Sequence, residues 1–147
     1  MPRSLEEKVA LVTGGSRGIG AAIAKRLASD GAQVAITYAK DANSASAVVK
    51  SIETAGGKAN AFRADAADPK AIQAAVKMTV ETFGQLDILV NNAGTAIPKP
   101  FEETTLEEMD QVINLNLRGV FVATQAALKH LRVAAASLLS AHVWARG

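Results

Sequence analysis

The sequence predicts an α/β protein built on a parallel sheet with helices on both faces. Two observations carry this prediction. From Lys8 to Val90, short apolar runs of strand length alternate with longer stretches whose apolar residues recur at helical spacing. A glycine-rich segment, Thr13–Gly20, joins the first apolar run to the first helical stretch, where a strand-to-helix connection needs a tight turn.

Four apolar runs have the length and composition of buried strands. They are Val9–Val12, Val34–Tyr38, Ala59–Arg63 and Leu86–Val90. The stretches between them are long enough for crossover helices. Because such crossovers are right-handed, the strands are expected to lie parallel and side by side.

Three helices are expected between these strands. The first carries apolar residues every four positions and stops at Gly31, and the second stops at Gly56–Gly57. The third begins at Asp68, a typical N-cap residue followed by proline at the first helical position, and runs toward Gly84.

A fourth helix is expected over about residues 106–131. Thr104 and Thr105 each have a glutamate three residues on, which is the capping-box pattern, and either can begin this helix. Asn116 lies inside it among apolar neighbours, where an amide needs a hydrogen-bond partner. The periodicity alone does not separate Asn116 from Asn114.

Composition excludes several functions. The chain has 147 residues, enough for one domain, with a formal net charge of +2, 2 histidines and no cysteine. This charge is too small to indicate nucleic-acid binding, and neither a disulfide framework nor a metal site is expected. No apolar run approaches the roughly 18 residues of a membrane span, and no targeting signal is visible. We therefore expect a cytoplasmic protein that binds no membrane.

The glycine-rich segment is the strongest functional signal. Its glycines are spaced Gly-x-x-x-Gly-x-Gly between a strand and a helix. Glycines at such a turn permit positive φ and let the backbone approach a pyrophosphate, while the amides at the helix N-terminus face the anion. The alternative is a glycine-rich turn that binds nothing. The expected phosphate-binding residues are Gly14, Ser16, Arg17, Gly18, Ile19 and Gly20.

Three further motifs follow in order: Asp65-Ala66, Asn91-Asn92-Ala93-Gly94 and Asn116-Leu-x-Gly119. Together with the glycine-rich segment they resemble the short-chain dehydrogenase/reductase family, especially its ketoreductases, over about residues 8–132. The resemblance implies the N-terminal half of a Rossmann-type doubly wound parallel sheet, truncated, with strand order 3-2-1-4. Residues 1–132 would form an incomplete NAD(P)-binding domain, and residues 133–147 an aberrant tail.

The resemblance also implies roles for these motifs. In that family Asp65, with Ala66 beside it, receives the adenine amino group, while Asn91, Ala93 and Gly94 lie along the adenine ribose. Independent of the family, the motifs at Asp65 and Asn91 each follow a predicted strand, at the end where open α/β sheets bind ligands. The alternatives are a solvated loop acid at Asp65 and a side-chain-stabilised turn at Asn91.

The end of the second strand predicts the cofactor. It reads Tyr38-Ala39-Lys40, without the acid that binds the ribose diol of NAD, and Arg17 adds a second positive charge. Both features favour NADP(H), with NAD(H) possible. Asp41 follows directly and would oppose a 2′-phosphate if the strand ended later. The alternative is that Arg17 and Lys40 are simply solvated.

The family's catalytic residues are incomplete in this sequence. The resemblance gives Asn116 a catalytic role: it kinks the helix and holds a water behind the catalytic lysine. A structural asparagine bonded to the helix backbone is the alternative. The family's serine and Tyr-x-x-x-Lys are expected to be absent, because Ser137 and Ser140 lie in the aberrant tail and Tyr38, the single tyrosine, belongs to the second strand. The expected protein is by family an NADP(H)-dependent oxidoreductase of a small-molecule carbonyl or alcohol, yet a chain that binds the dinucleotide without catalysis.

Two other functions remain open: a non-enzymatic sensor of NADP(H), and a fragment that co-assembles with a second chain. A shifted reading frame would explain the tail, because the codons of residues 133–142 permit a strand that ends in serine. A deliberate truncation or a fusion scar is the alternative. If the sheet stops at Leu86–Val90, that strand becomes an apolar edge. The helix over residues 106–131 also resembles the family's dimer-forming helix, so a homo-oligomer is expected.

Overall fold

The computed structural model describes residues 4–95, 97–131 and 136–139. Its centre is a 5-stranded parallel sheet in the order β3-β2-β1-β4-β5. The predicted order 3-2-1-4 is confirmed, with one further strand beside the fourth. The strands are β1 (Val9–Val12), β2 (Gln33–Tyr38), β3 (Ala59–Arg63), β4 (Ile88–Asn91) and β5 (Ala136–Leu139).

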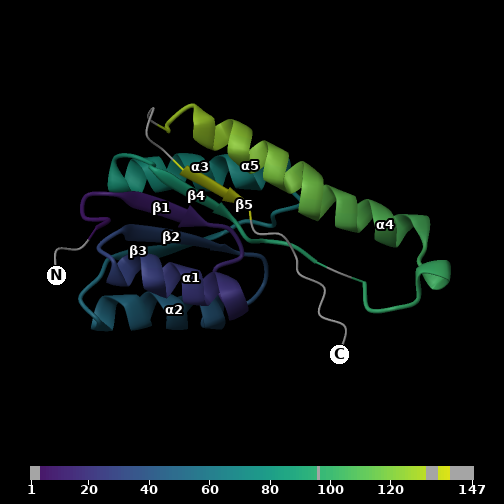
Figure 1. Cartoon of the computed structure of the whole chain (residues 1–147), viewed down its shortest axis with the longest axis horizontal. Coiled ribbons are helices and arrows are strands. Elements are labelled where there is room, and N and C mark those ends of the chain that lie inside the picture. The colour runs from purple at the N-terminus through teal and green to yellow at the C-terminus, as the bar shows by residue number, and fades with distance from the viewer. Residues whose placement is uncertain (1–3, 96, 132–135, 140–147) are drawn as a thin grey trace.

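Helices cover both faces of the sheet (Figure 1). One face packs against α1 (Gly18–Ser29) and α2 (Ala42–Thr54), and the other against α3 (Pro69–Phe83) and α5 (Gly119–Leu128). Successive residues of β1 serve opposite layers, since Val12 packs with α1 and α2 while Leu11 packs with α3 and α5. All four residues of β1 are buried, as expected for a strand with helices on both sides.

The predicted helix boundaries follow from local chemistry. The Asp68 carboxylate accepts hydrogen bonds from the amides of Lys70 and Ala71, at 3.0 and 3.4 Å, and α3 ends at Gly84 with φ +86°. Of the two threonines that could begin the fourth helix, Thr105 does so, because its hydroxyl accepts from the Glu108 amide at 3.1 Å.

The fourth helix has three parts. They are α4 (Leu106–Ile113), a π-helical turn, η2 (Asn114–Arg118), and α5, which follow one another without a break. A separate 3₁₀ turn, η1 (Phe101–Glu103), precedes α4. π-Helical turns insert an extra residue per turn and occur often at functional sites. None of the residues of α4 or η2 is buried, and Figure 1 shows α4 extending beyond the sheet.

The sheet does not stop at Leu86–Val90, so the condition under which that strand would be an apolar edge is not met. β5 pairs in parallel with β4, with Val90 opposite Leu138, so β4 is an interior strand. The segment Ala136–Leu139 has no β-branched residue and no glycine, proline, asparagine or aspartate beside it, and only its long-range pairing defines it as a strand. The rest of the predicted tail, residues 133–135 and 140–147, lies outside the described residues.

No helix within the described part of the chain is both long and apolar enough to cross a membrane. A cytoplasmic location stays a prediction of the sequence.

Candidate functional site

A cavity of about 730 Å³ opens at the carboxyl ends of the strands. The segments that follow β1, β2, β3 and β4 line it, and η2 adds one wall. The chain leaves β1 toward one face of the sheet and β4 toward the other, which is where open α/β sheets form ligand crevices. The lining residues are Gly14, Ser16, Arg17, Gly18, Ile19, Thr37, Tyr38, Ala39, Lys40, Asp41, Ala64, Asp65, Ala66, Asn92, Ala93, Gly94, Thr95 and Leu115.

The structure brings the predicted dinucleotide-binding residues together. All of them line the cavity except Gly20 and Asn91. Residues as far apart in the sequence as Gly14 and Leu115 therefore meet at one crevice. Sequence reasoning did not assign six of the lining residues to the site: Thr37, Asp41, Ala64, Asn92, Thr95 and Leu115.

Hydrogen bonds from both neighbouring strands hold the glycine-rich turn. The Gly14 amide donates to the Thr37 hydroxyl at 3.0 Å, and the Asn92 side-chain amide donates to the Gly14 carbonyl at 3.0 Å. The buried Thr13 hydroxyl accepts from the amides of Asn92 and Ala93, both at 3.1 Å. These bonds fix the turn before any ligand binds.

Gly20 supports the turn from behind. A Cβ on this residue would overlap the Asn92 side-chain amide and the Gly14 carbonyl, the two groups that bond to each other across the turn. Gly14 itself has φ +65°, and a Cβ there would meet the Ala93 Cα at 3.0 Å. The two glycines thus have different roles. Gly14 lines the cavity, whereas Gly20 permits α1 to pack closely against the glycine-rich turn.

The N-terminus of α1 has no capping side chain. Its N-cap residue, Arg17, makes no side-chain cap bond, whereas the caps of α2, α3 and α4 are filled by Asp41, Asp68 and Thr105. The first amides of a helix need acceptors from outside it, and they carry the positive end of the helix dipole. The cavity therefore has an uncapped, electropositive helix end in its wall.

Two cations and one carboxylate flank this wall. Arg17 and Lys40 are exposed and line the cavity with Asp41. β2 ends at Tyr38, so Asp41 does not end the strand and is instead the N-cap of α2. The hydroxyl and amide of Ser44 donate to Asp41 and lower the pKa of its carboxyl, and the charge of Arg17 lowers it further.

The segment after β3 makes a short turn. The exposed Asp65 carboxylate accepts from the Ala67 amide at 2.9 Å, a side-chain-stabilised turn that places Ala64, Asp65 and Ala66 along the cavity. Behind it, a Cβ on Gly119 would lie 2.5 Å from the Ala66 carbonyl oxygen. The glycine of the Asn-Leu-x-Gly motif therefore lets the long helix approach this segment.

Two asparagines join the segment after β4 to the long helix. The Asn116 amide bonds both ways to the backbone of Thr95, accepting from its N–H at 2.9 Å and donating to its carbonyl at 2.8 Å. Its partner is thus the cavity wall and not the helix backbone. The buried Asn91 donates to the Thr124 hydroxyl of α5 at 3.2 Å. Asn91 accordingly lies behind the cavity and not in its lining.

Farther along the same connection, the Lys99 ammonium pairs with the Glu108 carboxylate at 2.6 Å. The hydrogen bond from Lys99 is the main cause that lowers the pKa of Glu108. Within the described residues, no group of three or more His, Asp or Glu side chains is arranged to hold a metal ion.

Comparison with known proteins agrees with this geometry. A family model described as short chain dehydrogenase matches residues 8–138, most of the chain. The chain belongs to the short-chain dehydrogenase family. The match continues past Arg132, where the predicted resemblance stopped, and it includes most of β5.

Two similar proteins are identical to the chain at close to half of the aligned positions. An uncharacterized oxidoreductase of Methylorubrum extorquens is 50% identical over 127 residues, which are 86% of this chain and 51% of that protein. A hydroxynaphthalene reductase of Aspergillus fumigatus is 47% identical over 128 residues, 87% of this chain and 47% of that protein. The chain thus spans about half the length of the curated relatives it matches.

Among solved structures, a short chain dehydrogenase from Burkholderia cenocepacia, in complex with NADP, is 55% identical with a TM-score of 0.89. The alignment covers 92% of this chain and 55% of that one. The chain therefore shares the fold of about half of that protein.

Some of the residues that sequence reasoning missed act through side-chain hydrogen bonds to a distant segment, and others have apolar side chains. Thr37 and Asn92 hold the glycine-rich turn by hydrogen bonds across 23 and 78 positions of sequence. Asn92 lies inside the motif Asn91-Asn92-Ala93-Gly94, so its polar side chain was a signal in the sequence that it belongs to the site. Leu115 and Ala64 carry no chemical signal in the sequence.

Proposed function

We propose that this chain binds NADP(H) in a short-chain reductase of small-molecule carbonyls or alcohols, and that it prefers NADP(H) to NAD(H). The observation that carries the proposal is the cavity. It is lined by all but two of the residues that the sequence had selected for a dinucleotide, and its volume of about 730 Å³ lies in the range of ordinary ligand sites. The similar dehydrogenase from Burkholderia cenocepacia, solved with NADP, supports the same assignment.

The glycine-rich turn and the uncapped end of α1 fit a pyrophosphate. Gly14 and Gly18 have φ of +65° and +57°, so both need glycine to turn the backbone. Ser16, Arg17, Gly18 and Ile19 carry the amides at the start of α1, and an anion there would accept from donors that lack a capping side chain. Gly20 assists by leaving room for the turn.

Arg17 and Lys40 fit the 2′-phosphate that distinguishes NADP from NAD. Both line the cavity beside Tyr38 and Ala39, and β2 ends without an acid. A hydrogen bond between charged groups contributes about 1.5 to 3 kcal/mol. One such bond corresponds to roughly a tenfold preference or more, at about 1.4 kcal/mol for each factor of ten.

The adenosine half of the ligand would lie along the segments after β3 and β4. Asp65 and Ala66 offer a carboxylate and a backbone amide for the adenine, and Ala93 and Gly94 provide a surface without long side chains for the ribose. Asn91 contributes from behind, since it ties the end of β4 to α5.

When bound, the nicotinamide supplies or accepts a hydride. Carbonyl reduction also needs a donor for the developing oxyanion and a general acid, worth about 10²–10³ and 10²–10⁴ in rate respectively. The family provides these with a serine and Tyr-x-x-x-Lys, and the printed sequence contains no Tyr-x-x-x-Lys. Asn116 would position the wall at Thr95. We therefore propose that this chain binds the dinucleotide without measurable turnover.

The long helix favours self-association. Its exposed apolar residues form a row, and Leu117 and Phe121 are 68% and 65% exposed. Such a row on a helix is typical of an interface. A homo-oligomer is our first proposal for what covers it. A second chain that supplies the catalytic residues is the alternative function that the same row supports. The row is Leu106, Met109, Ile113, Leu117, Phe121 and Leu128.

Hydrogen exchange with and without NADPH tests the binding proposal. We expect slower exchange in residues 13–20, 37–41, 64–66 and 92–95, and unchanged exchange at the C-terminal ends of α1 and α2. Protection elsewhere, or none at saturating NADPH, would contradict the proposed site. A parallel assay of NADPH oxidation with simple ketones and activated β-ketoacyl substrates tests the catalytic part. Turnover by the highly purified chain would show that it needs neither the serine nor Tyr-x-x-x-Lys.

A further inference from the structure

We infer that Asp41 determines how strongly the site discriminates between NADP(H) and NAD(H), by holding a fixed negative charge beside the groups that would bind the 2′-phosphate. The inference rests on the proposed function and refines it. It makes Asp41 a specificity-determining residue that weakens the binding of NADP(H) and leaves that of NAD(H) nearly unchanged.

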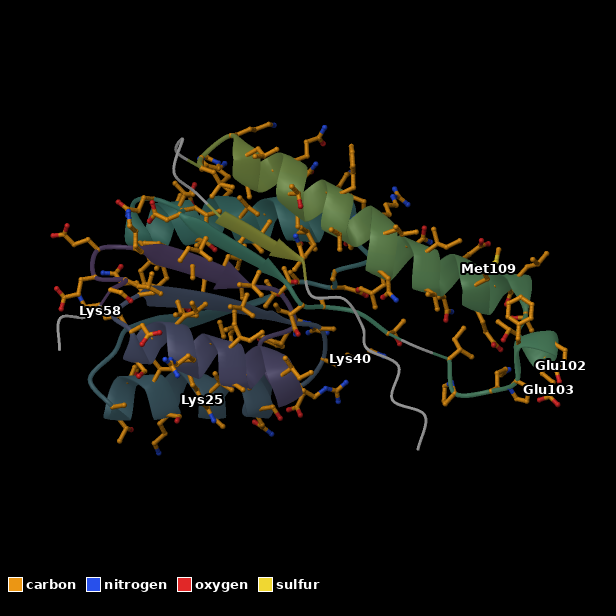
Figure 2. All side chains as sticks on the ribbon, in the orientation of Figure 1. Lys25, Lys40, Lys58, Glu102, Glu103 and Met109 are labelled. Carbon is orange, nitrogen blue, oxygen red and sulfur yellow. The ribbon has the colours of Figure 1, made fainter. Side chains whose placement is uncertain are left out.

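The position of Asp41 carries the inference. Asp41 lines the same cavity as Arg17 and Lys40, three residues after the end of β2, and Lys40 is labelled in Figure 2. The sequence alone left open whether Asp41 belonged to the strand or followed it. In the structure β2 stops at Tyr38, and Asp41 nevertheless lines the cavity together with Arg17 and Lys40. Its charge therefore lies in the wall that a 2′-phosphate bound by Arg17 and Lys40 would approach.

The Asp41 carboxylate is held in place. One oxygen accepts from the Ser44 amide at 3.0 Å and the other from the Ser44 hydroxyl at 2.5 Å, as the N-cap of α2. A capping carboxylate cannot turn away from the cavity without losing both bonds. A phosphate that arrives therefore meets a charge at a fixed place.

The charge of Asp41 persists at neutral pH. The bonds from Ser44 keep the pKa of this carboxyl below its usual range, and the positive charge of Arg17 acts in the same direction. The attraction between Asp41 and Arg17 also means that part of the field of Arg17 is already balanced. A 2′-phosphate carries nearly two negative charges. Its attraction to Arg17 would therefore be weaker beside the charged cap Asp41 than beside an uncharged cap residue.

The change that tests this inference preserves the cap. Asparagine and aspartate are about equally good N-caps, so Asp41→Asn removes the charge and keeps an oxygen for the Ser44 amide. Exposed unit charges about 4 Å apart interact only weakly in water, and salt screens them further. We expect a three- to tenfold gain in NADP(H) affinity and a change of less than twofold for NAD(H), which has no phosphate at that position.

Asp68→Asn is the matched control. Asp68 is also an N-cap aspartate, of α3, where it accepts from the amides of Lys70 and Ala71, and it does not line the cavity. The two variants make the same change of charge and the same change of cap. Only Asp41→Asn is expected to alter the affinity for NADP(H).

The experiment is a fluorescence titration of the wild-type chain and both variants with NADPH and with NADH, at low and at high salt. The inference predicts tighter NADPH binding by Asp41→Asn alone, with a gain that shrinks as salt is raised. Equal NADPH affinities in wild type and Asp41→Asn would overturn it. So would a loss of NADH affinity in Asp41→Asn, because Asp41 would then be a ligand of the ribose hydroxyls. If wild type binds neither cofactor, the proposed function itself fails, which is a different result.

Discussion

Gly20→Ala tests whether the glycine-rich turn is held from behind. The added methyl would overlap the Asn92 side-chain amide and the Gly14 carbonyl, so at least one of them must move. Overpacking of this kind costs about 1 to 3 kcal/mol. The gain in helix propensity from glycine to alanine returns up to about 1 kcal/mol. We therefore expect the free energy of unfolding to fall by about 0 to 2 kcal/mol.

The effect on binding should exceed the effect on stability. The methyl displaces the bond from Asn92 to Gly14, which is worth about 0.5 to 1.5 kcal/mol, and it also shifts the turn that would receive the pyrophosphate. A loss of about 1.4 kcal/mol corresponds to tenfold weaker binding, and we expect at least that. Urea unfolding and an NADPH fluorescence titration on the same samples measure the two quantities.

Gly57→Ala is the control for this prediction. Its methyl would lie 2.8 Å from the Ile52 Cγ2, a crowded contact at the end of α2 and outside the cavity. It should lower stability without changing the affinity for NADPH. The reasoning is refuted if folded Gly20→Ala binds NADPH as tightly as wild type, or if Gly57→Ala weakens binding to the same extent.

Three further predictions concern the long helix. Asn116→Ala removes two bonds to the Thr95 backbone and should lower the free energy of unfolding by about 1 to 3 kcal/mol in urea, unlike Asn114→Ala in the same π-helical turn. The pairing of Glu108 lowers its pKa below the usual value of 4.5, so its contribution to stability is present above that pH and is lost as pH falls through the lowered pKa. The difference in melting temperature between wild type and Glu108→Gln should therefore vanish in acid, and a constant difference would contradict this. Phe121→Glu should shift sedimentation toward the monomer, and an unchanged distribution would exclude that face as the interface.

Local sequence chemistry predicted much of the fold. β1 and β3 have the predicted bounds, Asp68 caps α3 as predicted, and Thr105, one of the two threonines that the sequence offered, caps α4. These elements depend on nearby residues, which a sequence displays directly. β5 was missed because its four residues carry no strand signal, and only pairing with β4 defines it.

The site was predictable where a side chain or a turn has one plain use. Most of the glycine-rich segment, Asp65 and Lys40 were assigned to a dinucleotide from the sequence, and these residues line the cavity. Gly20 was placed in the cavity because a glycine that touches a ligand and a glycine that permits close packing look alike in sequence. Thr37 was not assigned to the site because its hydroxyl accepts from Gly14, a residue 23 positions away, and such a contact is not visible in the sequence.

The central claim is that the described half of the fold is sufficient to bind NADP(H) selectively. Calorimetric titration of the purified chain with NADPH and with NADH tests it most directly, and the double variant Arg17→Ala with Lys40→Ala serves as the control. The account predicts saturable binding of NADPH at least tenfold tighter than that of NADH, and loss of this preference in the double variant. No binding of NADPH, or equal affinities for the two cofactors in wild type, would contradict it.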